Sequence, residues 1–133
     1  MLADRVLITG GPRCGKSTLA LTTALDLEVS EVQSTDTTKD MPWSEASALV
    51  ATWFDQAGPW VIEGVVVPRA LRKWLASHPT GKPCDRLIFL GRALQPLTVG
   101  QASMFKGVIT VLAEVVGELR DRGVEIDLDG GSK

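Results

Sequence analysis

The sequence contains few residues of the kinds that build zinc sites. Among 133 residues there are two cysteines, Cys14 and Cys84, and one histidine, His78. A structural zinc site usually takes four Cys or His ligands, so these three residues argue against such a centre. Neither cysteine lies in a C-x-x-C spacing, and the pair says nothing about a disulfide framework. We therefore expect the reducing cytoplasm as the compartment.

The chain also lacks a long apolar run and an excess of charge. No apolar run approaches the roughly 20 residues that span a bilayer, and the first residues predict a strand instead of a signal peptide. We therefore expect no membrane partner. Fourteen Lys and Arg face 16 Asp and Glu, a formal net charge of −2. Taken whole, this balance gives no sign of nucleic-acid binding, although a local basic face remains compatible with it.

What is present is the composition of a folded protein. Hydrophobic residues make up 44% of the chain and charged residues 23%, which excludes an intrinsically disordered chain. A length of 133 residues predicts a single domain over 1–133. We find no internal repeat and no linker.

Short apolar runs alternate with segments of helical periodicity. The runs predict buried strands over 5–9, 60–62, 86–90 and 124–128, with a weaker one near 30–34. The predicted helices are 15–27, one capped by Asp40 that continues to Ala57, one from Pro68 to the residue before Pro79, and one capped by Ser103 that ends at Gly123. Residues 93–101 look irregular. This order predicts a doubly wound α/β fold, with a five-stranded parallel sheet, helices on both faces and ligands beyond the carboxyl ends of the strands.

A phosphate-binding motif follows the first predicted strand. Residues 10–17 read GGPRCGKS and fit G-x-x-x-x-G-K-[ST] between a strand and a helix. The glycines let backbone N–H groups turn toward phosphate oxygens, and the following helix adds its positive end. Lys16 is expected to reach the β- and γ-phosphates, and Ser17 to bind Mg²⁺. The expected nucleotide-binding set is Gly10, Gly11, Pro12, Arg13, Cys14, Gly15, Lys16, Ser17 and Thr18.

With this motif, the order of elements resembles the small P-loop kinases, the group of nucleotide, nucleoside, shikimate and polynucleotide kinases. The resemblance implies a nucleotide-kinase-like P-loop NTPase fold, with ATP and Mg²⁺ as the cofactors. Several such kinases place an acidic residue after the second strand, facing the acceptor hydroxyl. Asp36 matches that place and is our candidate base, because a carboxylate can orient the attacking hydroxyl and take its proton. Asp40, four residues later, is a competitor.

The segment from Trp60 to Arg69 resembles the third-strand segment of nucleotide kinases, an apolar run followed by Asp-Gly and then Pro-Arg. Glu63 replaces the usual Asp, and we expect it to hold the Mg²⁺ shell. Three extra apolar residues separate Gly64 from the Pro-Arg pair. Arg69 is expected to bind acceptor phosphate or stabilise the transferring charge. A surface arginine at a helix start explains it equally well.

Related kinases carry a lid with arginines after the fourth strand. Here Arg92 and Lys106 are the basic candidates, and we assign Arg92 the catalytic role, with Arg13 as a further helper. Trp43 can either stack on a planar acceptor or pack at a helix start.

These residues predict transfer of the γ-phosphoryl group of Mg-ATP to a hydroxyl of a nucleoside, a nucleotide or a nucleic-acid component. One narrower version resembles the phage-type kinases that phosphorylate a hydroxymethylated base in DNA. The alternative is a P-loop ATPase or nucleotide-binding switch without a small-molecule acceptor; the N-K-x-D motif of a GTPase is absent from the sequence. A degenerate binding module is a third hypothesis, and an oligomer is compatible with all three.

Overall fold

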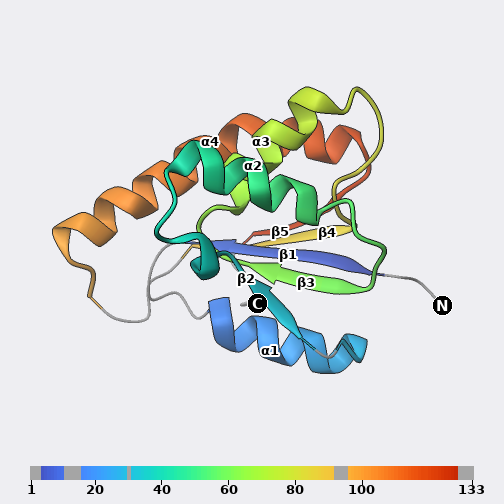
Figure 1. Ribbon diagram of the computed structural model, residues 1–133, viewed down its shortest axis with the longest axis horizontal. Coiled ribbons are helices and arrows are strands. Elements are labelled where there is room, and N and C mark those ends of the chain that lie inside the picture. Colours follow the sequence, from blue (N-terminus) through green and yellow to red (C-terminus); the bar gives the residue numbers. More distant parts are fainter. Residues whose placement is uncertain (1–3, 11–15, 30, 92–95, 129–133) are drawn as a thin grey trace.

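A computed structural model describes residues 4–10, 16–29, 31–91 and 96–128, without the side chains of Lys16 and Ser17 (Figure 1). Strands and helices alternate along the chain. In order, the elements are β1 (Arg5–Gly10), α1 (Lys16–Leu27), β2 (Val32–Ser34), the 3₁₀ helix η1 (Thr35–Thr38), α2 (Trp43–Trp53), β3 (Trp60–Glu63), α3 (Val67–Ser77), β4 (Arg86–Leu90), α4 (Val99–Asp121) and β5 (Glu125–Leu128).

The five strands form one parallel sheet in the order β2-β3-β1-β4-β5, which confirms the predicted α/β class. Strand β1 lies at the centre, and its residues Val6, Leu7 and Ile8 have no exposed surface. Successive side chains of a strand point to opposite faces of the sheet. Leu7 accordingly packs in one apolar layer, and Val6 and Ile8 pack in the other. Both faces of the sheet centre are therefore covered.

Helix α1 lies on one side of the sheet, and α2, α3 and α4 lie on the other (Figure 1). The chain leaves β1 toward the first side, whereas it leaves β3 and β4 toward the second. In open α/β sheets, ligands bind beyond the carboxyl ends of the strands, where neighbouring connections diverge in this way. The divergence on either side of β1 therefore points to the carboxyl edge as the place for a site.

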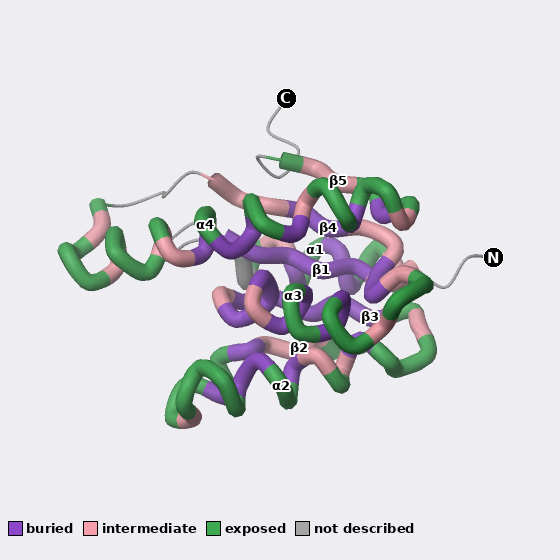
Figure 2. Tube along the Cα trace, turned by 90° about the horizontal axis from the view of Figure 1, so that it is seen from above, coloured by how far each residue is buried: buried purple, intermediate pink, exposed green. Residues whose placement is uncertain are grey.

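Helix α4 begins earlier than the sequence predicts, so the expected irregular segment 93–101 and the Ser103 cap are wrong in part. Thr98 is the N-cap: its Oγ1 accepts a hydrogen bond from the Gln101 N–H at 3.1 Å, and the Gln101 Oε1 accepts one from the Thr98 N–H at 3.0 Å. This reciprocal capping box satisfies two N–H groups at the helix start. It adds the turn that begins at Val99, and Figure 2 shows this exposed N-terminal part of α4 extending away from the sheet.

Two further boundaries differ from the expectation. Asp40 does not cap α2, because Pro42 occupies the N-cap position without a side-chain hydrogen bond, and the helix ends at Trp53 instead of Ala57. The polar segment Thr35–Thr38 follows β2 directly. It forms η1, where the Ser34 hydroxyl accepts a hydrogen bond from the Asp36 N–H at 3.2 Å. Thr35 and Thr38 are buried in this turn.

Helix α4 is the described helix for which the question of membrane-spanning length arises, although Lys106 and Glu114 interrupt its apolar residues. This helix has 23 residues and is apolar enough, by length and composition alone, to cross a membrane. The core helix of a folded domain passes the same test. Its buried residues, Val108, Val111, Leu112, Val115 and Leu119, lie in its C-terminal two thirds.

Candidate active site

Two hydrogen bonds join the ends of β1 and β3 at the carboxyl edge of the sheet. The Gly64 N–H donates to the Ile8 carbonyl at 3.0 Å, and the buried Thr9 hydroxyl donates to the Gly64 carbonyl at 2.9 Å. In the strand register, Ile8 lies opposite Glu63. Glu63 is therefore held beside the end of β1, where the GGPRCGKS segment begins.

Glu63 is a buried acidic residue with 4% of its surface exposed. It has no ion pair or side-chain hydrogen bond within the part of the chain that the structure describes. Mg²⁺ is commonly bound through one or two carboxylates together with waters and phosphate oxygens. A carboxylate at this strand end, without a partner among the described side chains, suits that chemistry. Among the described residues, no group of three or more His, Cys, Asp or Glu side chains gathers into a site made by protein ligands alone.

The elements on either side of the GGPRCGKS segment are those the sequence predicts. Strand β1 ends at Gly10, and α1 begins at Lys16. Thr18 is exposed on α1. The other expected residues of this loop, Gly11, Pro12, Arg13, Cys14 and Gly15, lie outside the described residues, and so does Arg92. Lys106 is exposed on α4.

Close contact between Thr35 and Gly64 joins η1 to the end of β3. Gly64 has a φ of +146°, and a Cβ added to it would lie 1.7 Å from the Thr35 Oγ1. Only a residue without a side chain lets η1 approach this strand end so closely. The contact fixes Asp36, the next residue of η1, near the carboxyl edge. Nothing in the polar sequence around Thr35 predicts that this residue is buried.

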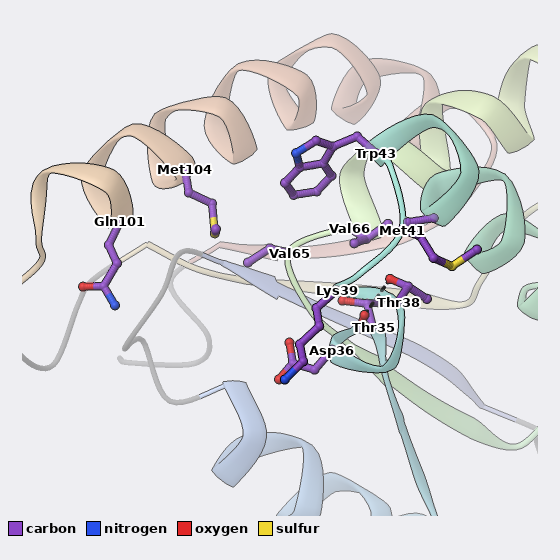
Figure 3. Close-up of a pocket in the computed structure, with 11 residues that line it drawn as sticks. Thr35, Asp36, Thr38, Lys39, Met41, Trp43, Val65, Val66, Gln101 and Met104 are labelled. Carbon is purple, nitrogen blue, oxygen red and sulfur yellow. Dashed lines mark hydrogen bonds between the residues drawn. The ribbon is translucent and has the colours of Figure 1, made fainter.

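A pocket of about 440 Å³ opens beside η1 (Figure 3). It is lined by Thr35, Asp36, Thr38, Lys39, Met41, Trp43, Ala46, Val65, Val66, Gln101 and Met104. Asp36 is among the lining residues, and its competitor Asp40 is not. In Figure 3, Asp36 and Lys39 lie together at one end of the pocket, and Trp43 enters from the other. The pocket therefore has a charged end and an apolar end.

Arg69 lies against Trp43. Its Cζ is 4.3 Å from the centre of a Trp43 ring, and its Nη2 is 3.4 Å from the point where a Cβ of Gly107 would stand. The guanidinium thus stands where α2, α3 and α4 meet. Arg69 is not among the lining residues of the pocket, and it has no ion pair with a described carboxylate. The arginine expected to bind acceptor phosphate therefore supports the wall of the pocket.

The N-terminal part of α4 supplies the far wall, through Gln101 and Met104. Phe105 anchors it by stacking on Phe89 of β4, with ring centres 6.4 Å apart and ring planes 22° apart. The predicted helix start at Ser103 excluded Gln101, which the Thr98–Gln101 capping pattern could have placed on the helix. Met104 lay inside the predicted helix, but no local pattern predicted that it lines the pocket.

Two groups with shifted pKa values lie at the opposite, amino edge of the sheet. Burial raises the pKa of the Cys84 thiol to about 12. Burial also tends to raise the pKa of Asp85, but hydrogen bonds and charge from Arg5, with the charge of Lys82, outweigh it and lower that pKa. The Arg5 N–H donates to the Asp85 Oδ2 at 2.8 Å, which joins the starts of β1 and β4. The Arg5–Asp85 ion pair links two strands at the amino edge of the sheet, opposite the edge that bears the pocket.

Comparison with known proteins assigns no family to this arrangement. No protein-family model matches the chain, and no curated protein matches its sequence. The function is therefore argued from the residues and their geometry.

Proposed function

We propose that this chain is a P-loop kinase that transfers the γ-phosphoryl group of Mg-ATP to a hydroxyl of a nucleoside, a nucleotide or a nucleic-acid component. One observation carries the proposal. A pocket containing Asp36 lies at the carboxyl edge of a parallel sheet, beside the strand ends that bear Glu63 and the GGPRCGKS segment. A phosphate donor, a metal-binding carboxylate and an acceptor pocket would then meet at one edge.

The donor side rests on the first strand–helix unit. Lys16 is the first residue of α1, so the backbone N–H groups at this helix start face the end of β1. Lys16 would bind the β- and γ-phosphates, and Ser17 would bind Mg²⁺ together with Glu63. The ion, when bound, neutralises charge on the phosphate oxygens.

The acceptor side rests on Asp36. In this proposal its carboxylate accepts a hydrogen bond from the attacking hydroxyl, orients the oxygen and takes the proton as the new O–P bond forms. The contact of Thr35 with Gly64 holds the start of η1 against β3, so the carboxylate keeps its place without a mobile loop. Phosphoryl transfer depends mainly on such positioning.

An acceptor screen with γ-labelled ATP tests the proposal. Nucleosides, nucleotides, plain DNA and DNA with hydroxymethylated bases are offered to the wild type and three variants. We expect Lys16→Ala to lose ATP binding. Asp36→Asn should lose transfer by roughly 10²- to 10⁴-fold while it still binds ATP, because only the proton acceptor is removed.

Asp40→Asn is the matched control, since this nearby acidic residue does not line the pocket. It should transfer phosphate at the wild-type rate. Unchanged turnover in Asp36→Asn would refute the assignment of the base. Release of labelled phosphate without any acceptor product would favour the ATPase alternative.

A further inference from the structure

The apolar end of the pocket is built from flat and flexible side chains. Trp43 enters from the start of α2 and Met104 from α4, Val65 lies between them and below, and Val66 lies beside Met41 (Figure 3). Trp43 is 44% exposed, although it is among the largest apolar side chains of the molecule. An aromatic face left open to a pocket is suited to stack on another flat ring, and methionine adapts its shape to a neighbouring aromatic group.

Trp43 is held in place from outside the pocket. The Arg69 guanidinium lies over the indole, and its Nη2 also lies beside Gly107 of α4. A cation over an indole face is attracted by the π electrons and restrains the ring. Trp43 is therefore fixed before any ligand arrives, which lowers the ordering cost of binding.

The two ends of the pocket define the shape of the ligand. A sugar alcohol would leave the Trp43 and Met104 walls without a partner. A purely apolar ligand would leave Asp36 and Lys39 without one. A flat ring that carries a hydroxylated group satisfies both ends, and a volume of about 440 Å³ lies within the usual range of small-molecule sites.

We propose that the pocket binds its acceptor through a nucleobase held between Trp43 and Met104, with the hydroxylated part of the acceptor at Asp36. Arg69 is then a positioning residue that acts through Trp43. The role given to Asp36 rests on the proposed function, whereas the binding of the base rests on the pocket walls alone.

Equilibrium binding without ATP tests the base-binding part. Adenosine and thymidine are titrated into the full chain by calorimetry, with ribose as the probe that lacks a base. We expect both nucleosides to bind more tightly than ribose. Trp43→Ala should weaken nucleoside binding roughly tenfold or more, as removal of an aromatic partner does for stacked bases. Trp43→Phe keeps a flat ring and should stay within about threefold of the wild type.

Leu49→Ala is the matched control, because Leu49 lies on the same helix, is 40% exposed and does not line the pocket. It should bind nucleosides as the wild type does. Thermal unfolding of each variant shows whether it is folded. If Trp43→Ala is unfolded, the folded variant Trp43→Phe is used for the comparison in its place. Equal binding of ribose and nucleosides, no nucleoside binding, or unchanged binding in Trp43→Ala would each overturn the proposal.

The same variants separate this inference from the proposed function. Nucleoside binding that depends on Trp43, without any transfer from ATP, would support the base site and refute the kinase. Transfer to a ring-free acceptor that Trp43→Ala leaves unchanged would support the kinase and refute the base site.

Discussion

Gly64 and Thr35 are packed so closely that a Cβ at position 64 would lie 1.7 Å from the Thr35 Oγ1 and 2.7 Å from its Cβ. Gly64 also combines a φ of +146° with two hydrogen bonds to β1 through its N–H and its carbonyl. The contact joins three strand ends, because η1 follows β2, Gly64 follows β3, and Ile8 and Thr9 belong to β1. The carboxyl edge of the sheet therefore depends on one residue without a side chain.

Gly64→Ala should destabilise the protein by about 2–6 kcal/mol. The added methyl group meets Thr35 and the positive φ disfavours any L side chain, and each of these effects costs about 1–3 kcal/mol. Urea unfolding followed by circular dichroism measures the loss. Phosphate transfer should fall as well, because the displacement moves Asp36.

Gly117→Ala is the matched control. Gly117 is exposed in the C-terminal part of α4, and a Cβ there meets nothing within 4 Å. Alanine is the better helix former, so this variant should gain about 0.5–1 kcal/mol. Equal stability of the two alanine variants would show that the contact of Gly64 with Thr35 has no energetic weight.

Asp85 makes the stability of the protein depend on pH. Its Oδ2 accepts a hydrogen bond from the Arg5 Nε at 3.2 Å, and its Oδ1 lies 3.5 Å from the Lys82 Nζ. The folded-state pKa of Asp85 is lowered, so its contribution is complete above the unfolded pKa, about 3.9. It is lost as the pH falls through the lower folded pKa. Asp85→Asn should cost about 1 kcal/mol at pH 7.

The urea midpoints of the wild type and Asp85→Asn should begin to converge below about pH 4 and should meet once the pH lies below the folded-state pKa of Asp85, where the wild-type carboxylate is protonated. Glu31→Gln removes an exposed carboxylate that has no ion pair among the described residues, and its curve should follow the wild type. A constant difference between wild type and Asp85→Asn from pH 7 to pH 2 would contradict the ion pair. ATP binding at pH 7 should be the same in both, because Asp85 lies at the edge opposite the pocket.

Cys84 should resist thiol reagents in the folded protein. It is fully buried, and burial raises its pKa to about 12, so roughly one thiol in ten thousand is ionised at pH 8. In Cys14→Ser it is the remaining thiol of the chain. We expect no reaction with a chromogenic disulfide in native buffer over an hour and complete reaction in urea. Rapid labelling of the native variant would mean that this part of the sheet opens.

Sequence periodicity predicted the elements whose burial follows from local spacing. Val108, Val111 and Leu112 of α4 are buried as their spacing predicts, and the short apolar runs formed the parallel strands. The predicted start of α4 was too late, because Gly100 is unfavourable in a helix and lies between the two capping residues, Thr98 and Gln101. Capping depends on a few specific hydrogen bonds, which a search for apolar periodicity does not detect.

The pocket could be predicted only in part. Asp36 was found because it follows a strand. Its partners Trp43 and Met104 come together only when α2 and α4 pack on the same face of the sheet, and no local pattern encodes that meeting. The stacking of Arg69 on Trp43 could not be predicted for the same reason, because it depends on the packing of α3 against α2.

We expect Glu63 to lower the stability of the fold while it contributes to the binding of Mg²⁺. A buried ionised carboxylate without a partner is costly, whereas an amide of the same shape costs less. Glu63→Gln should therefore unfold at the same urea concentration as the wild type or a higher one. If Glu63 holds Mg²⁺, the Mg²⁺ concentration for half-maximal transfer should rise roughly tenfold or more. Glu63→Asp keeps the charge on a shorter side chain and should give an intermediate Mg²⁺ response. An unfolding midpoint well below the wild type, together with an unchanged Mg²⁺ response, would mean that Glu63 serves only the fold.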